Sequence, residues 1–156
     1  MPHPIRLATL DDIRRALDLA LRVFMEFEAP DYPPGAEENW RAQIGAKAVD
    51  PDMYLSGRRL LFVALDGDRV VGMAESRETG HIAMLFVDGA YHRRGVATAL
   101  TNEMVDALKT RGFNEVTVNA SPYGLPFYRH FGFRPTGPEQ QKDSFIFTPM
   151  VYEQTR

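Results

Sequence analysis

The residues with the clearest chemical pattern lie in the segment 86–97, FVDGAYHRRGVA. An apolar run ends there, a short loop follows, and a helix is expected to begin at Gly95. The first N–H groups of a helix have no partner within it, and together with the positive end of the helix dipole they can bind an anion. Because positions 95 and 97 hold small residues, a ligand could approach these N–H groups closely, and Arg93 and Arg94 add positive charge. The segment therefore predicts an anion site; the alternative is a solvated helix start with two surface arginines.

The longer segment 81–100, HIAMLFVDGAYHRRGVATAL, resembles the signature of the GNAT superfamily of acetyl-coenzyme A (acetyl-CoA) dependent N-acetyltransferases. In that family the fourth strand runs into a loop of the form Gln/Arg-x-x-Gly-x-Gly/Ala. Two residues depart from the pattern, since His92 stands where Gln or Arg is usual and Gly89 where Pro is frequent. The resemblance implies that the loop amides bind the diphosphate of acetyl-CoA and that the strand backbone binds its pantetheine arm. It thereby implies cofactor contacts at Leu85, Phe86, Val87, His92, Arg93, Arg94, Gly95, Val96, Ala97 and Thr98.

The segment 119–133 is similar to a second GNAT segment, in which a polar residue lies seven positions before a tyrosine and Gly-Phe follows. Ser121 takes the polar position, which is usually Asn, and Tyr128 is the tyrosine. Acyl transfer from a thioester releases a thiolate, which a phenol at hydrogen-bond distance can stabilise or protonate. Tyr128 is thus the expected general acid and, with Asn119 and Ser121, an expected cofactor contact. The alternative role of Tyr128 is packing between the last helix and the sheet.

The sequence leaves open which group accepts the proton of the amine, which must be neutral in order to attack. Glu75 and His81 are the candidates for a catalytic base, and Asn119 ends a later strand beside the reacting centre. The alternative role of Glu75 is that of a solvent-facing edge residue, that of His81 a turn residue, and that of Asn119 a strand-end cap. Alternation along 81–87 places the odd-numbered residues on one face, with no carboxylate among them. A water-mediated base and a substrate that arrives deprotonated also remain open.

Five acidic residues and no Lys or Arg lie between Arg22 and Arg41. In the proteins that this chain resembles, the region forms one wall of the acceptor groove. A negative potential there would concentrate a cationic amine, and aromatic faces can bind an ammonium group. The alternative is an acid-rich helix start favoured by the helix dipole. The acids are Glu26, Glu28, Asp31, Glu37 and Glu38, and the expected substrate contacts are Phe27, Tyr32 and Trp40.

The elements that position these residues follow from apolar periodicity and turn signals. A Thr9–Asp12 capping box begins the first helix, and three strands from residue 60 to 87 form an antiparallel meander. Strand, long helix and strand then make a βαβ unit, whose strands run parallel with a right-handed crossover. We expect an α/β fold of the GNAT type, with a mixed, mostly antiparallel sheet of about six to seven strands and helices on both faces. Strands are expected at 5–8, 60–65, 69–75, 81–87, 115–118 and 144–152, and helices at 13–27, 37–49, 96–110 and 125–131.

Composition limits the class of protein. The 156 residues fit one domain, 1–156, and Lys+Arg 18 against Asp+Glu 21, a net charge of −3, argues against a nucleic-acid binder. No apolar run approaches the roughly 18 residues of a spanning helix, and no secretory signal is visible. The absence of cysteine excludes thiolate metal sites and a cysteine acyl-enzyme. We expect a cytoplasmic protein without metal, membrane or nucleic-acid partners. Edge strands and the apolar run 145–147, expected to be exposed, make a homodimer a reasonable expectation, and a monomer fits equally well.

The leading hypothesis is an N-acetyltransferase that moves acetyl from acetyl-CoA to a primary amine by direct attack in a ternary complex. The acceptor is predicted to be a small cationic amine or a peptide amine flanked by basic residues. One alternative is a CoA-binding sensor or regulatory domain without turnover, and another is an acetyltransferase that acts on a protein or peptide amine. A plain nucleotide-phosphate binder is disfavoured, because the P-loop pattern and the three-glycine dinucleotide fingerprint are both absent.

Overall fold

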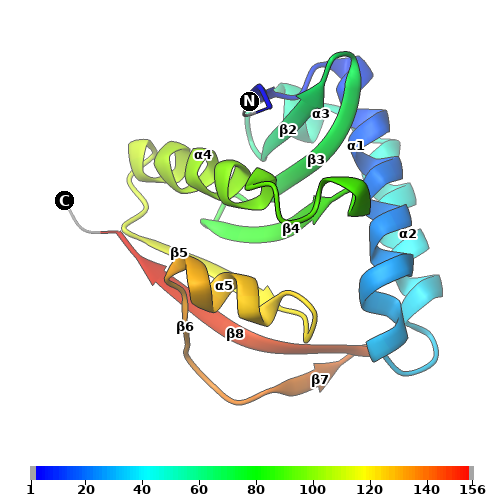
Figure 1. Ribbon diagram of the computed structural model, residues 1–156, viewed down its shortest axis with the longest axis vertical. Helices are drawn as coiled ribbons and strands as arrows, with labels where there is room; N and C mark the ends of the chain where they lie inside the picture. The colour runs from blue at the N-terminus through cyan, green and yellow to red at the C-terminus, as the bar shows by residue number, and fades with distance from the viewer. Residues whose placement is uncertain (1–2, 155–156) are drawn as a thin grey trace.

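The computed structural model of the chain describes residues 3–154. No helix among these residues is long and apolar enough to cross a membrane. In chain order the elements are β1 (Ile5–Leu7), α1 (Leu10–Val23), a π-helical turn η1 (Phe24–Glu28), a 3₁₀ turn η2 (Ala29–Asp31), α2 (Ala36–Ala48), α3 (Asp52–Leu55), β2 (Leu60–Asp66), β3 (Arg69–Ser76), β4 (His81–Val87), a 3₁₀ turn η3 (Gly89–Tyr91), α4 (Val96–Thr110), β5 (Glu115–Ala120), α5 (Leu125–Phe131), β6 (Arg134–Pro135), β7 (Gln140–Lys142) and β8 (Phe145–Glu153) (Figure 1).

The strands form one mixed sheet in the order β1-β2-β3-β4-β5-β8-β6, and β7 pairs with β8. Within residues 3–154 the pair β4–β5 is parallel and the other pairs are antiparallel. This confirms the predicted mixed, mostly antiparallel α/β fold. The sheet has eight strands rather than six or seven, because β6 and β7 span only 2 and 3 residues and are too short to show an alternating pattern.

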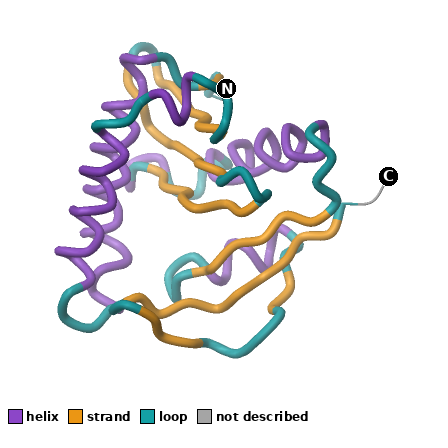
Figure 2. Tube along the Cα trace, turned by 180° about the vertical axis from the view of Figure 1, so that it is seen from behind, coloured by secondary structure: helices purple, strands orange, loops and turns teal. Residues whose placement is uncertain are grey.

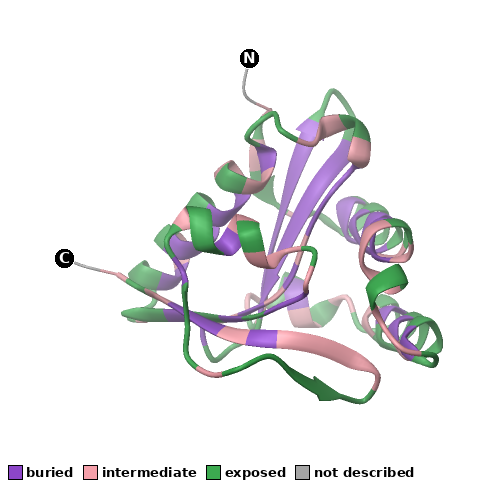
Figure 3. Ribbon diagram, turned by 60° about the horizontal axis from the view of Figure 1, so that its bottom comes forward, coloured by how far each residue is buried: buried purple, intermediate pink, exposed green. Residues whose placement is uncertain are grey.

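Helices cover both faces of the first half of the sheet. α1 and α2 pack on one face, where Leu17, Trp40 and Met73 belong to one buried cluster. α4 packs on the other face, where Leu100 and Met104 belong to a second cluster. Colouring by burial shows β2 and β3 enclosed between these layers (Figure 3). Burial on both faces explains why the central strands are almost wholly apolar in sequence.

The start of α1 follows the predicted capping box. The Asp12 N–H donates to Thr9 Oγ1 at 3.4 Å, and the Thr9 N–H donates to Asp12 Oδ2 at 3.0 Å. The Arg6 guanidinium donates to the same carboxylate from β1, with Nη2 3.1 Å from Oδ1. These bonds satisfy N–H groups that the helix itself leaves without a partner.

The end of α1 differs from the prediction of one helix through residue 27. The turn Phe24–Glu28 is π-helical, and the Ala29 N–H donates to the Phe24 carbonyl. A π turn inserts one extra residue, so the side chains after it point in new directions. Phe24 stays in the core below α1, whereas Phe27 turns toward the ring of His92. Such turns leave no mark in the apolar periodicity.

A β-bulge interrupts β4. Glu75 pairs with Met84 but Ser76 pairs with Ile82, which leaves Ala83 as the extra residue. Ala83 and Met84 therefore both pack toward α1, whereas Leu85 packs toward α4. The expectation that the odd-numbered residues of 81–87 share one face is thus wrong.

The opening that this fold provides lies between β4 and β5. Their parallel pairing joins His81 to Thr117 and Ile82 to Val118, and beyond Ile82 the two strands diverge. Figures 1 and 2 show the separation from opposite sides, with α4 on one flank and α1 and α2 on the other. The sheet is therefore split at its centre, starting at the bulge.

Candidate active site

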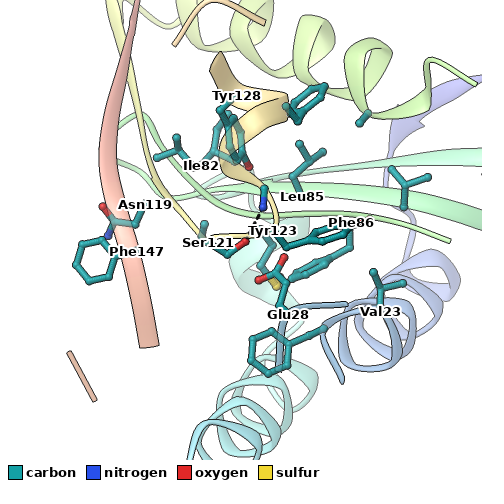
Figure 4. A pocket seen from close by; sticks show the side chains of 18 of the residues that line it. Val23, Glu28, Ile82, Leu85, Phe86, Asn119, Ser121, Tyr123, Tyr128 and Phe147 are labelled. Atoms are coloured by element: carbon teal, nitrogen blue, oxygen red, sulfur yellow. Dashed lines mark hydrogen bonds between the residues drawn. The ribbon is translucent and has the colours of Figure 1, made fainter. Parts of the chain in front are cut away.

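A cavity of about 890 Å³ occupies the opening between β4 and β5. Its walls come from both faces of the sheet: from α1 to α2 on one side, and from the loop before α4 and the β5–α5 connection on the other. Figure 4 shows part of this lining, with Glu28, Phe86, Ser121 and Tyr128 around a common space. A ligand could thus enter from one face and meet a second ligand from the other.

One end of the cavity is the start of α4. Gly95, at φ +79°, precedes the helix and no side chain caps it. The first hydrogen bond within the helix is donated by the Ala99 N–H to the Gly95 carbonyl at 3.0 Å, so the N–H groups of residues 96–98 have no carbonyl partner inside the helix. These residues and Arg93 line the cavity, whereas the Arg94 guanidinium lies over the Tyr91 ring at 5.3 Å. The arrangement suits an anion such as a diphosphate.

His92 lines the cavity and contacts residues of both of its walls. Its Nε2 lies 2.7 Å from the Val87 carbonyl oxygen and must therefore carry the proton and donate. Nδ1 is then an acceptor for the Tyr123 hydroxyl at 3.3 Å. Phe27 stacks on Tyr123 with 5.2 Å between ring centroids and lies 4.8 Å from the His92 ring. This three-ring bridge (Phe27, His92 and Tyr123) uses Phe27, which was expected to touch substrate but does not line the cavity.

Tyr128 stands on the α5 wall. The Gly124 N–H donates to Ser121 Oγ at 3.0 Å, which fixes the turn into α5. The Tyr128 ring is buried and packs edge-on against Phe133 at 5.2 Å between centroids. Burial, with a contribution from the Glu28 charge, raises the pKa of Tyr128 far above its usual value. The phenol therefore stays protonated at neutral pH, and Tyr128 both packs and lines the cavity.

Glu28 is the functional candidate that sequence reasoning missed. It is the last residue of the π turn η1 and lines the cavity. In Figure 4 its carboxyl group points toward Ser121. Burial raises the pKa of Glu28 to about 7; hydrogen bonding by Ser121 opposes the rise and the Asp31 charge adds to it. A carboxyl group with such a pKa can accept a proton at neutral pH and return it to water.

The other acids of the segment 22–41 do not reach the cavity. Glu26, Asp31, Glu37 and Glu38 are exposed, and only Glu28 of the five lines it. The sequence showed five equivalent acids, because nothing in it marks the π turn that directs one of them inward.

Glu75 has a structural environment. Its side chain is 0% exposed and lies outside the cavity lining. Lys47 Nζ lies 2.8 Å and an Arg59 nitrogen 3.7 Å from Glu75 Oε1, and the Tyr54 hydroxyl donates to its other oxygen. A buried carboxylate needs such partners, and these tie α2, α3 and the α3–β2 connection to β3. The placement supports neither the expected catalytic base nor the solvent-facing alternative.

His81 lines the cavity, with its Nδ1 2.8 Å from Thr117 Oγ1. Burial, with the Arg77 charge, lowers the pKa of His81 to about 4. The imidazole is neutral at pH 7, but at that pKa it is a weaker base than Glu28.

Most of the predicted site residues come together in the cavity, whereas Phe27, Glu75 and Arg94 do not. Some lining residues that the sequence did not predict belong to β4 itself, and others come from elements distant along the chain, among them η1, β7 and β8. The predicted residues that line the cavity are Tyr32, Trp40, His81, Leu85, Phe86, Val87, His92, Arg93, Gly95, Val96, Ala97, Thr98, Asn119, Ser121 and Tyr128.

The sequence is similar to a known protein family and to individual N-acetyltransferases. Residues 28–154 match the Acetyltransferase (GNAT) domain family. An uncharacterized N-acetyltransferase of Methanocaldococcus jannaschii is 28% identical over 137 residues, which cover 84% of this chain and 60% of that protein. The uncharacterized N-acetyltransferase YafP of Escherichia coli is 39% identical over 123 residues, which cover 79% of this chain and 75% of that protein. The chain thus spans little more than half of the archaeal relative.

The fold also matches a solved structure. The PaiA N-acetyltransferase from Thermoplasma acidophilum, in complex with coenzyme A, superposes with a TM-score of 0.80 at 18% identity, over 98% of this chain and 99% of that one.

Proposed function

The chain belongs to the GNAT acetyltransferase family, and on this premise we propose that it transfers an acetyl group from acetyl-CoA to a primary amine. The observation that carries the proposal is one cavity, lined from both faces of the sheet, that brings together the uncapped start of α4, Tyr128 and Glu28. These groups are an anion site, a proton donor and a proton acceptor, which is the set that acyl transfer from a thioester to an amine requires.

The acetyl-CoA donor fits the α4 side of the cavity. We place its diphosphate on the N–H groups of residues 93–98 and its pantetheine arm between β4 and β5, beyond Ile82. β4 pairs with β3 on one side, while the side that faces β5 leaves backbone groups beyond Ile82 without a strand partner. An extended ligand with amide groups can pair with such a strand. The coenzyme A complex of the Thermoplasma protein, which shares the fold, supports this choice of donor.

The proposed reaction is direct attack in a ternary complex. The amine nitrogen forms a bond to the thioester carbonyl carbon, the C–S bond then breaks, and the sulfur leaves with the electron pair. Glu28 accepts the proton that the nitrogen loses, and Tyr128 donates a hydrogen bond to the departing sulfur. Glu28 returns its proton to water, and the thiolate takes up a proton from water, so the products are the N-acetyl amide and the CoA thiol. Because the chain has no cysteine, no thiol is at hand for an acyl-enzyme.

Release of the CoA thiol from the purified chain tests the proposed function. We expect release that requires both acetyl-CoA and a primary amine, with an acetylated amine identified by mass spectrometry. Coenzyme A binding in calorimetry without turnover of any amine would instead favour the sensor domain without activity.

The diphosphate site leads to a prediction about the start of α4. Gly95→Val adds bulk at a left-handed residue, where a Cβ is strained, and Ala97→Leu adds bulk in ordinary helical geometry. We expect each change to raise the KM for acetyl-CoA by about tenfold or more, equivalent to about 1.4 kcal/mol, and to change the KM for the amine much less. Calorimetry with coenzyme A is the direct measurement. Parental affinity in the folded Ala97→Leu variant would contradict the placement of the diphosphate.

A protein or peptide amine is the main alternative acceptor within the same family. A cytoplasmic location, a homodimer and a single domain over 1–156 stay predictions from the sequence, as does a reaction that needs no metal.

A further inference from the structure

The acceptor side of the cavity has a wall made of aromatic rings. They come from the helical layer, from β4 and from the start of β8, and all of them line the cavity. Phe86 lies beside Glu28, and Phe147 lies next to Asn119 (Figure 4). The six residues of this aromatic wall are Phe24, Tyr32, Trp40, Phe86, Phe145 and Phe147.

Five of the six rings, all except Phe147, form a contiguous surface. Phe24 stacks on Trp40 with 4.6 Å between centroids, and Phe86 meets Trp40 edge-on at 5.7 Å. Phe145 approaches Phe24 and Tyr32 edge-on at 6.1 and 5.6 Å. The indole N–H of Trp40 donates to a backbone carbonyl at 3.3 Å. A ligand in the cavity would therefore meet the carbon atoms of this ring and not its hydrogen-bond donor. Such a surface binds another ring through stacked and edge-to-face contacts.

The charges around the cavity do not suit a polycation. The acids that line it are Glu28 and Asp143, against Arg77, Arg93 and Lys142. A polyamine or an aminoglycoside would need several carboxylates for its several ammonium groups. A single amine needs only the one carboxyl group, Glu28.

The β7–β8 turn covers the acceptor side. Ser144 Oγ donates to the Pro34 carbonyl at 3.0 Å, and Asn39 Nδ2 donates to the Asp143 carbonyl at 3.4 Å. These bonds join the turn to the η2–α2 connection and to α2. A peptide acceptor that passed between β8 and α2 would have to break them, whereas a small molecule would not.

We propose that the acceptor is a small primary amine carried by an aromatic ring, with the ring held on the aromatic wall and the nitrogen next to Glu28. This inference rests on the proposed function and narrows its substrate. The short link between ring and nitrogen lets the ring reach the wall while the nitrogen reaches the thioester.

The test compares amines that differ in one property at a time, at saturating acetyl-CoA. 2-Phenylethylamine and 2-cyclohexylethylamine have the same charge and similar length, but only the first has an aromatic ring; spermidine and a short peptide with a free N-terminus complete the set. We expect kcat/KM for 2-phenylethylamine to exceed that for the cyclohexyl compound by about three- to tenfold, the scale of one or two aromatic contacts. Spermidine and the peptide should be poorer still.

A variant tests whether the preference for an aromatic amine depends on the aromatic wall. Phe145→Leu keeps an apolar side chain but removes a half-buried ring, and it should lower kcat/KM for 2-phenylethylamine by about three- to tenfold while the cyclohexyl compound changes much less. Phe131→Leu is the matched control, because this α5 ring packs against Tyr152 outside the cavity lining. If Phe145→Leu fails to fold, Tyr32→Leu replaces it, because Tyr32 lines the cavity and its ring contacts Phe24 and Phe145.

The outcomes separate this inference from the proposed function. Equal losses for both amines in Phe145→Leu, or a higher kcat/KM for spermidine or the peptide, would overturn the aromatic acceptor and leave the acetyltransferase intact. Failure to acetylate any amine would overturn both.

Discussion

Replacement of Glu28 by glutamine is expected to lower kcat by about 10²-fold or more, the usual contribution of a positioned proton acceptor. Glutamine has nearly the same shape and can still interact with Ser121, but it cannot take up the amine proton. The KM for acetyl-CoA should stay close to that of the parent, because Glu28 lies on the acceptor side of the cavity. Steady-state kinetics with both substrates varied separates the two effects.

The pH profile makes the Glu28 prediction sharper. Since burial raises the pKa of Glu28 to about 7, kcat/KM for the amine should rise with pH through this value in the parent, and the variant should lose that rise. The further rise of kcat/KM caused by titration of the free amine should persist in both proteins. Glu26→Gln is the matched control, because this exposed acid belongs to the same π turn but lies outside the cavity lining. An unchanged profile in Glu28→Gln would exclude Glu28 as the proton acceptor.

Stability offers an independent check on the same residue. A carboxyl group whose pKa is higher in the folded than in the unfolded state holds its proton more tightly when folded. The free energy of unfolding therefore falls as pH rises from about 4.5 to about 7. Glu28→Gln removes this loss, so its Tm relative to the parent should be higher at pH 8 than at pH 5. Equal Tm differences at both pH values would mean that folding does not raise this pKa.

The second large effect is expected for Tyr128→Phe, which should lower kcat by about 10²-fold. Phenylalanine keeps the ring that packs against Phe127 and Phe133, so the fold and the affinity for coenzyme A should persist while the departing sulfur loses its donor. Tyr152→Phe is the matched control, since this tyrosine packs on Phe133 but does not line the cavity.

Conditions in which chemistry limits the rate are needed for the Tyr128 measurement, because slow product release would hide the effect. If Tyr128→Phe has the same kcat as the parent under those conditions, the role of this tyrosine is packing alone.

The parts of the fold that the sequence predicts are those with local signals. β4 and α5 have the expected bounds, His81–Val87 and Leu125–Phe131, because turns and apolar spacing mark both ends. The bulge at Ala83 could not be found, since the strand HIAMLFV is apolar almost throughout and a one-residue shift leaves no polar residue on the wrong face.

In the candidate site, too, the residues that could be predicted are those with a local signal in the sequence. The anion loop was predictable because its function depends on backbone and on small residues at fixed spacing, both visible in one segment. Glu28 and Phe145 were not, because they come to line the same cavity only when η1 and β8, which are far apart in sequence, take their places in the fold. Glu75 was predicted as a possible base because its strand alone does not show its partners. Lys47 from α2 and Tyr54 from α3 bind its carboxylate in the folded protein.

The divergence of β4 from β5 has a consequence for solubility. A row of backbone N–H and C=O groups without a strand partner invites strand addition by another molecule, which is how many sheets begin to aggregate. β4 presents such a row in the middle of the sheet. His92 Nε2 donates to the β4 carbonyl of Val87 at 2.7 Å, and the same ring contacts Phe27 and Tyr123. A strand from a neighbouring molecule that paired with β4 as far as Val87 would first have to displace this side chain. His92 therefore also opposes misassembly of a sheet that stays open at its centre.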